Sequence, residues 1–286
     1  MRILLAGKNG QVGWELQRTL AMLGEVIACD RSEFDLANPD QIVAVVRETK
    51  PQIIVNAAAY TAVDKAESEP VLAHAINGRA PGILADQAKQ LDALLVHYST
   101  DYVFDGTKAG PYTEEDTPNP LSVYGSTKLA GEQAIQVSGC RHLIFRTSWV
   151  YGPRGKNFLL TILRLAKERD ALNVVDDQTG SPTTVNMITE ATLACIQNAV
   201  KNATPHYGVF HMTAMGETTW CQFAKTALKQ AGLGMKINPI PSSEYPTPAK
   251  RPNNSRLDNS LLYKTFGVRL PSWQEGLESV INTLTH

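Results

Sequence analysis

The sequence predicts an α/β protein, with a doubly wound, Rossmann-type parallel sheet and a smaller, mainly C-terminal second domain. Short apolar runs alternate with helical patterns through the first half of the chain, and a glycine-rich turn follows the first run. This regular alternation breaks near Gly152. Continuous apolar strands that alternate with helices are typical of a parallel sheet covered on both faces.

Five apolar runs in the first half are expected to be strands. They lie at residues 3–6, 25–30, 52–58, within 93–104, and at 142–148. Apolar residues recur with helical spacing between these runs, at residues 12–23, 41–49, 71–90 and 123–137. This order of elements is the one expected of a sheet whose crossovers are helices.

The second half of the chain is less regular. Helical spacing is found at residues 157–169, 185–200 and 218–231, with one strand-like run at 209–212. The prolines between positions 239 and 252 predict an ordered, irregular segment, because each proline fixes its own φ angle. Two short helices are expected to close the chain. We expect residues 1–151 to form the first domain and 152–286 most of the second, with segments near 183–206 returning to the first.

The composition is that of an ordinary globular protein. Of the 286 residues, 43% are hydrophobic and 19% are charged, and the formal net charge is -1. A chain without a basic field has little attraction for nucleic acids or anionic membranes, so neither is expected as a partner. The N-terminal apolar run is too short for a signal sequence, and no run approaches the length of a membrane span. We therefore expect a cytoplasmic protein.

The cysteines and histidines lack the spacing of a metal site, because neither Cys-x-x-Cys nor His-x-x-x-His occurs. Thiols stay reduced in the cytosol, so free, buried cysteines are expected at Cys29, Cys140, Cys195 and Cys221. Glu15 and Glu190 would suit a magnesium or interface site, although isolated acids on helices are usually only solvated.

The turn after the first strand has the pattern Gly-x-x-Gly-x-x-Gly. Gly7, Gly10 and Gly13 occupy its three positions, with a strand before the turn and a helix after it. Glycines let the backbone turn tightly and approach a pyrophosphate, and the helix N-terminus offers that anion free N–H groups. The turn therefore predicts a dinucleotide cofactor bound by the first domain. The alternative is an ordinary strand-to-helix turn that tolerates glycine.

The end of the second strand bears on which cofactor is used. Asp30 follows the glycine turn by roughly twenty residues, where a carboxylate accepts hydrogen bonds from the adenosine ribose of NAD. Arg31 is adjacent and would suit the 2′-phosphate of NADP instead. The sequence leaves NADH and NADPH open. Asp35 and Leu36, in the following loop, are candidates for contact with the adenine.

Tyr124 and Lys128 are the candidate catalytic pair. They open a predicted helix, and their i, i+4 spacing places both side chains on one helical face. Reducing a ketone requires a proton at its oxygen, but a free tyrosine has a pKa of about 10. A lysine ammonium at about 4 Å would lower that pKa by about three units. A surface pair is the alternative, and the position of this helix after the fourth strand favours a site.

Polar residues gather where the fourth strand ends, at Ser99, Thr100, Asp101 and Tyr102. Ligands of doubly wound sheets bind beyond this end of the strands. Because side chains alternate along a strand, Ser99 and Thr100 point in opposite directions, and only one hydroxyl faces a substrate carbonyl. The alternation does not say which of the two it is.

Several segments together resemble a known family. The glycine turn, the Tyr-x-x-x-Lys pair, and residues 56–64 (NAAAYTAVD) and 99–106 (STDYVFDG) are similar to the extended short-chain dehydrogenase/reductases. Later segments narrow the resemblance to the dTDP-4-dehydrorhamnose reductases: residues 146–152 (RTSWVYG), 178–183 (QTGSPT) and 251–255 (RPNNS). The resemblance covers nearly the whole chain, and its later segments are far more specific than the turn and the pair.

The resemblance implies reduction of dTDP-4-dehydro-6-deoxy-L-mannose to dTDP-L-rhamnose by NADPH or NADH, on the way to cell-surface polysaccharides. Tyr124 would donate a proton to the C4 oxygen. Lys128 would hold the nicotinamide ribose hydroxyls and lower the tyrosine pKa, and Thr100 would bond the carbonyl or tune the tyrosine. Substrate contacts are implied for Asp101, Tyr102 and Trp149. Cofactor contacts are implied for Gly7, Gly10, Gln11, Val12, Gly13, Asp30, Asp35, Leu36, Ala59, Tyr60 and Thr61.

Other assignments stay open at this level. Tyr60 stands where several relatives have histidine, and its backbone is expected to make the contact. Arg251 would either meet the nucleotide diphosphate or form a structural salt bridge. Magnesium is associated with the family, and a homodimer is a candidate state. The alternative functions are another nucleotide-sugar enzyme, such as an epimerase or a 4,6-dehydratase, and a non-catalytic cofactor-binding subunit like that of methionine adenosyltransferase.

Overall fold

The central element of the fold is a sheet of parallel strands. The computed structural model describes residues 1–202 and 206–285. The sheet has the order β10-β5-β4-β3-β1-β2. Its strands are β1 (Arg2–Ala6), β2 (Glu25–Cys29), β3 (Ile53–Asn56), β4 (Leu94–Thr100), β5 (His142–Thr147) and β10 (Gly208–His211). The predicted doubly wound, Rossmann-type sheet is confirmed, and the strand-like run of the second half forms its sixth strand.

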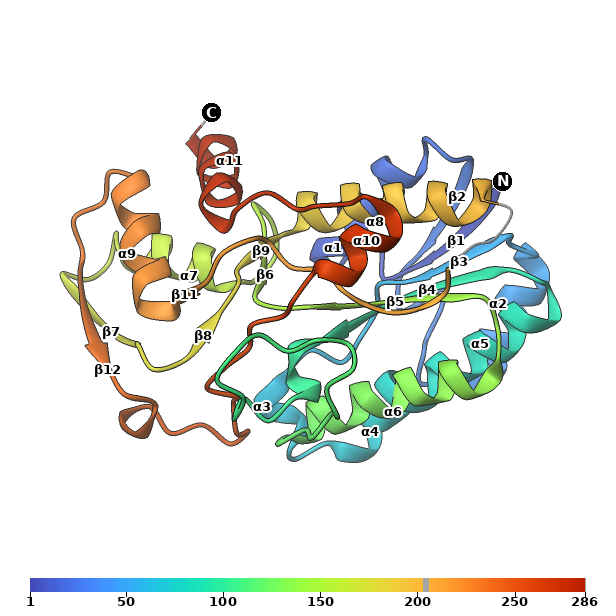
Figure 1. Ribbon diagram of the computed structural model, residues 1–286, viewed down its shortest axis with the longest axis horizontal. Coiled ribbons are helices and arrows are strands. Elements are labelled where there is room, and N and C mark those ends of the chain that lie inside the picture. Colours follow the sequence, from blue (N-terminus) through green and yellow to red (C-terminus); the bar gives the residue numbers. More distant parts are fainter. Residues whose placement is uncertain (203–205, 286) are drawn as a thin grey trace.

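Helices cover both faces of this sheet (Figure 1). On one face lie α1 (Gln11–Leu20), α8 (Val185–Lys201) and the short α10 (Ser260–Phe266). On the other face lie α2 (Pro39–Thr49), α5 (Ala80–Gln90) and α6 (Val123–Ser138). Each face encloses its own cluster of buried apolar side chains. A sheet buried on both faces explains why its strands are continuous apolar runs.

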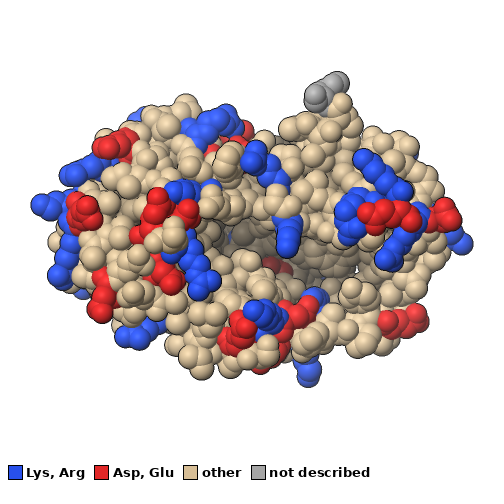
Figure 2. All heavy atoms as spheres, turned by 180° about the vertical axis from the view of Figure 1, so that it is seen from behind, with Lys and Arg blue, Asp and Glu red and all other residues tan. Residues whose placement is uncertain are grey.

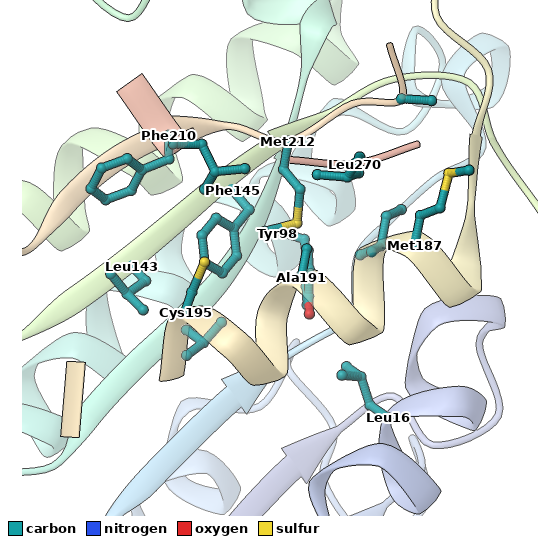
Figure 3. Packing of buried hydrophobic residues seen from close by; sticks show 14 of the residues in the cluster. Leu16, Tyr98, Leu143, Phe145, Met187, Ala191, Cys195, Phe210, Met212 and Leu270 are labelled. Atoms are coloured by element: carbon teal, nitrogen blue, oxygen red, sulfur yellow. The ribbon is translucent and has the colours of Figure 1, made fainter. Parts of the chain in front are cut away.

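Helix α8 shows how the second half of the chain returns to the sheet. Its residues Met187, Ala191 and Cys195 are four apart, so they share one helical face. In Figure 3 this face lies against Tyr98 of β4 and Phe145 of β5. The packing places α8 beside α1, although the two helices are far apart in the sequence.

The expected helix at 71–90 is interrupted. It consists of α4 (Pro70–His74), a π-helical turn (Ala75–Arg79) and α5, after the short α3 (Val63–Ala66). Asn77 lies in the π-helical turn, and its side-chain amide accepts from the Tyr60 N–H at 2.8 Å and donates to the Tyr60 carbonyl at 3.0 Å. Single π-turns inside helices are often found at functional sites. Here the turn aims Asn77 at the segment that follows β3.

The remaining elements form a smaller lobe, on the left in Figure 1. It contains α7 (Phe158–Leu165), α9 (Trp220–Gln230), α11 (Trp273–Thr285) and three two-stranded sheets. Their strand pairs are β7 (Ala171–Val175) with β12 (Lys236–Ile240), β8 (Thr179–Gly180) with β11 (Thr218–Thr219), and β6 (Val150–Tyr151) with β9 (Thr183–Thr184). A separate apolar cluster fills the space between α7, α9 and the β7–β12 pair.

The proline-rich segment is ordered and mostly irregular, as predicted. Pro239 is an exception, because it lies within β12. That strand pairs only with β7, so one of its edges is open and tolerates a residue without an N–H. All four cysteines are free and buried, as expected. Among the helices of residues 1–202 and 206–285, none has both the length and the apolar character to cross a membrane.

Candidate active site

A cavity of about 720 Å³ opens at the carboxyl edge of the central sheet. It lies where β1 and β3 are neighbours, with β2 continuing the sheet on one side and β4 on the other. A doubly wound sheet binds its ligands at this reversal of strand order. Figure 2 shows the molecule hollowed near its middle, with both basic and acidic side chains along the rim. The lining includes Gly7, Gly10, Gln11, Val12, Asp30, Asp35, Leu36, Ala59, Tyr60, Thr61, Tyr124 and Lys128.

The glycine turn forms one wall of the cavity. Gly7 has a φ of +89°, and a Cβ atom there would lie 2.9 Å from the Ala58 nitrogen. A Cβ atom on Gly13 would lie 2.0 Å from the Gly7 carbonyl oxygen. Among the residues that the structure describes, no side chain caps α1 at Gly10, which leaves its first N–H groups directed at the cavity. The wall therefore fits an anionic diphosphate.

The corner beyond this wall carries both an acid and bases. Asp30 accepts hydrogen bonds from the Ser32 N–H at 2.9 Å and the Ser32 hydroxyl at 2.6 Å, and these hold its pKa below the usual range. Lys8 lies 3.6 Å from Asp30 and is paired with Glu33. Arg31 is 3.7 Å from Asp35. Because carboxylate and cations are both present, the choice between NADH and NADPH stays open.

The segment after β3 lines the cavity with its backbone. Ala59, Tyr60 and Thr61 all border the space. The Tyr60 hydroxyl donates to Glu69 at 2.6 Å, while the Asn77 side chain is hydrogen-bonded to both the N–H and the carbonyl of Tyr60. The Tyr60 side chain is thus engaged elsewhere, and the arrangement agrees with a contact made through the backbone.

Helix α6 brings the candidate catalytic pair to the opposite wall. Ser122 caps the helix by accepting from the Gly125 N–H at 3.2 Å. A Cβ atom on Gly125 would lie 2.2 Å from the Tyr102 carbonyl oxygen, so glycine permits the close packing there. Tyr124, half-buried, and Lys128 both line the cavity. The Tyr124 ring meets the Tyr102 ring edge-on, with the ring centroids 5.5 Å apart.

The structure separates the two hydroxyls at the end of β4. Thr100 lies beside the Tyr124 phenol and donates to Asp101 Oδ1 at 3.0 Å. Ser99 also borders the cavity, but its hydroxyl donates to Glu132 of α6. Thr100 is therefore the hydroxyl next to the proposed proton donor. Burial raises the pKa of Asp101 to about 6.

The expected lowering of the Tyr124 pKa is wrong for this structure. Burial raises that pKa to about 12, and the adjacent Thr100 hydroxyl opposes the rise. The reason lies in Lys128, whose amine donates to the Tyr98 carbonyl at 2.5 Å and lies 3.2 Å from His97 Nε2. Both residues are on α6 as expected, but the lysine amine makes its hydrogen bonds to residues of β4.

A buried ion pair lies beneath the candidate catalytic residues Tyr124 and Lys128. Arg146 of β5 and Glu132 of α6 form a bidentate contact, with the closest atoms 2.6 Å apart. His211 of β10 lies 3.4 Å from Arg146, and burial lowers its pKa to about 3. The Ser99 hydroxyl completes the coordination of Glu132. These side chains join three strands and α6 directly under the reactive surface.

The implied substrate residues lie toward the smaller lobe. Trp149 follows β5 in the left-handed region, with a φ of 48°, and its ring stacks on Trp220 at 3.5 Å. A non-glycine residue in that region is strained, and such strain is found mostly at functional sites. Arg251 forms a salt bridge with Asp64 at 2.8 Å, which is the structural alternative named for it above. Tyr102 lies against Tyr124 as described.

Further residues take part that the sequence did not single out. Thr147 and Lys156 line the cavity. Asn77 holds the Tyr60 backbone, and His97 contacts the Lys128 amine. The signals were weak: Lys156 follows a glycine in an irregular loop, and His97 and Asn77 are isolated polar residues in otherwise apolar patterns.

The residues present fit a nicotinamide dinucleotide. Cβ atoms on Gly7 or Gly13 would collide with backbone at the cavity wall, and Thr147 Oγ1 is buried without a hydrogen-bond partner in the described part of the chain. For a metal, in contrast, residues 1–202 and 206–285 hold no group of three or more His, Cys, Asp or Glu side chains placed to share an ion. Glu15 is paired with Arg18 at 3.3 Å, and Glu190 is exposed. Magnesium stays a prediction.

The family model described as RmlD substrate binding domain matches residues 1–286. The chain belongs to this family. Relatives of this chain include proteins named dTDP-4-dehydrorhamnose reductase. That of Burkholderia thailandensis is 48% identical over 285 residues, which cover 96% of each chain. That of Escherichia coli is 48% identical over 294 residues, covering 99% of this chain and 98% of the relative.

Solved structures agree with this membership of the RmlD family. A dTDP-4-dehydrorhamnose reductase of Clostridium acetobutylicum is 40% identical, with a TM-score of 0.95 and full coverage of both chains. One from Bacillus anthracis, solved in complex with NADP, is 37% identical, with a TM-score of 0.93 and 99% coverage of both chains. A UDP-glucose 4-epimerase of Thermus thermophilus is 21% identical with a TM-score of 0.84, and this likeness shows the fold alone.

Proposed function

We propose that this RmlD-family chain reduces dTDP-4-dehydro-6-deoxy-L-mannose to dTDP-L-rhamnose, with NADPH or NADH as reductant. The observation that carries the proposal is the position of Tyr124 beside Thr100, on the wall of a cavity whose opposite wall is the glycine turn. A carbonyl held between them meets a proton donor and a nicotinamide site together. The names of the full-length relatives supply the sugar and the nucleotide.

The cofactor, when bound, supplies the hydride that reduces the sugar C4. The glycine turn would receive its diphosphate, and Asp30 its adenosine ribose, with Asp35 and Leu36 near the adenine. Ala59, Tyr60 and Thr61 would contact the middle part of the cofactor. The Bacillus anthracis relative binds NADP, which supports NADPH, while Asp30 supports NADH. We infer that both are accepted at this corner.

Tyr124 would deliver the proton. With a pKa of about 12, the phenol is fully protonated at neutral pH, so it carries a proton to give. The oxygen of the reduced sugar is an alkoxide, a stronger base than a phenolate, and takes this proton readily. Thr100 would orient the carbonyl by turning toward it the hydroxyl hydrogen that it otherwise donates to Asp101. A positioned donor of this kind contributes about 10²- to 10⁴-fold to a rate.

Lys128 would change partner in the loaded site. We propose that its amine leaves Tyr98 and His97 and turns toward the nicotinamide ribose hydroxyls. There its positive charge would also lie closer to Tyr124 and stabilise the phenolate that remains after proton transfer.

Asp101, Tyr102 and Trp149 would contact the sugar nucleotide. Arg251 is the candidate for its diphosphate, because a guanidinium suits phosphate and the Asp64 pair is only partly buried. In binding a diphosphate, Arg251 would exchange one anionic partner for another. The division at residue 151, the return of residues 183–206 and the homodimer stay predictions.

The direct test is Tyr124→Phe. We expect turnover with the 4-keto sugar to fall by about 10²- to 10⁴-fold, because the donor is lost. NADPH binding, followed by its fluorescence, is expected to stay at the wild-type level, because the ring remains. Tyr263→Phe is the matched control, since Tyr263 is half-exposed on α10. Unchanged turnover in Tyr124→Phe would remove this residue from the proton-donor role.

The alternative functions give different outcomes in the same assay. An epimerase or a dehydratase would change the sugar without net consumption of NADPH. A non-catalytic regulatory subunit would bind NADPH and turn over no keto sugar at all. Tyr124 and Lys128 line one cavity, and Thr100 lies beside Tyr124; this grouping favours the reductase over the last possibility.

A further inference from the structure

Two polar side chains lie side by side in the most buried part of the sheet. Asn56 of β3 and His97 of β4 are each 1% exposed, and they are register partners across the β3–β4 pair. The buried polar groups of a protein are almost always hydrogen-bonded, and a polar pair in an apolar layer costs stability unless it is satisfied. Their hydrogen bonds lead directly to Lys128.

The hydrogen bonds of Asn56 fix the state of the His97 ring. Asn56 Oδ1 accepts from the Ala58 N–H at 3.2 Å, so its amide nitrogen is the atom 3.1 Å from His97 Nδ1. An amide nitrogen only donates, so Nδ1 must accept. A neutral imidazole has one donor and one acceptor, which places the hydrogen of His97 on Nε2. Burial and the nearby lysine lower the pKa of His97 well below its usual value, which agrees with a neutral ring.

This tautomer sets what Lys128 meets. Its Nζ lies 3.2 Å from His97 Nε2 and 2.5 Å from the Tyr98 carbonyl oxygen. An ammonium has donors only, so it would face the Nε2–H with another N–H. An uncharged amine keeps one lone pair, which accepts from Nε2–H while the amine donates to Tyr98. The resting contact therefore favours the uncharged amine.

The surrounding charges do not reverse this preference. The titratable or charged side chains on the elements around Lys128 are Tyr124 and Glu132 of α6, His97 and Tyr98 of β4, His142 and Arg146 of β5, and Asp101 after β4. Glu132 raises the pKa of Lys128, but its carboxylate is already paired with Arg146 at 2.6 Å. Burial is the largest influence and lowers the pKa of Lys128 to about 8.

We propose that His97 is a positioning residue for Lys128: with its tautomer set by Asn56, it presents an N–H that disfavours the ammonium form of Lys128 while the nicotinamide site is empty, so that the amine is uncharged in mildly alkaline solution. Binding of the cofactor draws the amine to the ribose hydroxyls, which accept hydrogen bonds. The amine then takes a proton from solvent and becomes an ammonium. This inference rests on the proposed use of a nicotinamide cofactor.

The consequence is a proton taken up when cofactor binds. The free enzyme titrates Lys128 near a pKa of about 8, and hydrogen bonds to the ribose hydroxyls would raise that pKa in the loaded enzyme toward the ordinary value of 10.5. Between these values the loaded state holds a proton that the free state lacks. We expect most of one proton per site to be taken up at about pH 9, and little at about pH 6.5.

The experiment is calorimetry of NADPH binding to the full chain at about pH 9, in two buffers of different ionisation enthalpy. The slope of binding enthalpy against buffer enthalpy counts the protons. Lys128→Met is expected to abolish the uptake, which assigns it to this side chain. His142→Gln is the matched control, because His142 lies at the opposite end of β5, and it is expected to keep the wild-type uptake.

Two variants change the group that faces Lys128. His97→Gln supplies an amide oxygen in place of the N–H, so the resting lysine becomes charged and the uptake is largely lost. Asn56→Asp keeps an acceptor for Ala58 but accepts from His97 Nδ1–H, which turns the Nε2 lone pair toward Lys128. It is expected to abolish the uptake with His97 still in place. His97→Leu supplies neither donor nor acceptor and is expected to keep the uptake, because burial alone still disfavours the ammonium.

The outcomes separate this inference from the proposed function. Loss of uptake in His97→Gln and Asn56→Asp but not in His97→Leu supports the inference, because a merely structural role would affect the Gln and Leu variants alike. Wild-type uptake in both His97→Gln and Asn56→Asp overturns it, as does NADPH binding by the wild-type chain without uptake at about pH 9. Absence of any NADPH binding would overturn the proposed function itself.

Discussion

The two walls of the active site are built by different means. The glycine wall, around β1, β3 and α1, is made of backbone and small side chains, and its fit depends on the missing Cβ atoms of Gly7 and Gly13. The tyrosine wall, around β4, β5 and α6, is made of large polar side chains above a buried ion pair between Glu132 and Arg146. The glycine wall depends on the absence of side-chain atoms, and the tyrosine wall depends on balanced buried charges.

This difference determines how each wall responds to change. A wall made of backbone loses its fit to the ligand when side-chain atoms are added. A substitution there leaves no buried charge without a partner. A layer of side chains contains charges that are balanced only together, so removing one leaves its partner in an apolar interior. We therefore expect the most destabilising substitutions under the tyrosine wall and smaller, steric effects at the glycine wall.

The largest effect is expected from Arg146→Met. Its removal leaves Glu132, which is 1% exposed, without its bidentate partner. Breaking a buried pair in this way costs about 3–5 kcal/mol in the free energy of unfolding. Urea denaturation of the purified variant measures the loss.

The matched control is Arg164→Met on α7, whose pair with Glu168 has closest atoms 2.8 Å apart and is largely exposed. Exposed pairs contribute about 0–1 kcal/mol. If Arg146→Met lost no more stability than Arg164→Met, the buried pair would not be the support of the tyrosine wall.

The next effect concerns the pH dependence of stability at Asp101. Burial raises its pKa from 3.8 to about 6, so between these values the folded chain holds a proton that the unfolded chain has released. The contribution of Asp101 to stability is therefore present at low pH and is lost as pH rises through about 6. A shift of about two units corresponds to about 3 kcal/mol.

Asp101→Asn cannot ionise and removes this dependence. The stability of the variant relative to wild type is expected to rise by up to about 3 kcal/mol between about pH 4 and about pH 7. Urea denaturation at several pH values follows the difference. A difference that stays constant over this range would mean that Asp101 ionises normally in the folded chain.

The smallest of these effects is expected at the glycine wall. Gly13→Ala places a Cβ atom against the Gly7 carbonyl, so the start of α1 must shift. Overpacking of this kind costs about 1–3 kcal/mol, and the shift should also weaken NADPH binding. Gly234→Ala is the control, because a Cβ atom there meets nothing within 4 Å. Equal NADPH affinity in the two variants would show that the turn does not cradle the cofactor.

The glycine wall could be predicted from the sequence because its chemistry is local. Gly7, Gly10 and Gly13 lie in one turn, and the strand before and the helix after are evident from apolar spacing. The sheet was predictable for the same reason, because each strand is a continuous apolar run. The position of β10 was not, since the pairing of residues 208–211 with β5 depends on contacts distant in the sequence.

The tyrosine wall was only partly predictable. Helical spacing places Tyr124 and Lys128 on one face, but it does not say where the lysine amine ends. That depends on His97 and Tyr98, which lie on another element. The alternation of β4 left Ser99 and Thr100 equivalent until the structure showed that Ser99 donates to Glu132 while Thr100 lies beside Tyr124. Buried polar partners are set by the tertiary fold, and no sequence pattern in one segment encodes them.

The most direct test of the account is the reduction itself. The wild-type chain is mixed with dTDP-, GDP- or UDP-linked 4-keto sugars and with NADPH or NADH, and the cofactor absorbance is followed while the products are identified. The account predicts that dTDP-4-dehydro-6-deoxy-L-mannose alone drives rapid oxidation, with one cofactor consumed for each dTDP-L-rhamnose formed. Cofactor that binds but is not consumed in the presence of this sugar would contradict it.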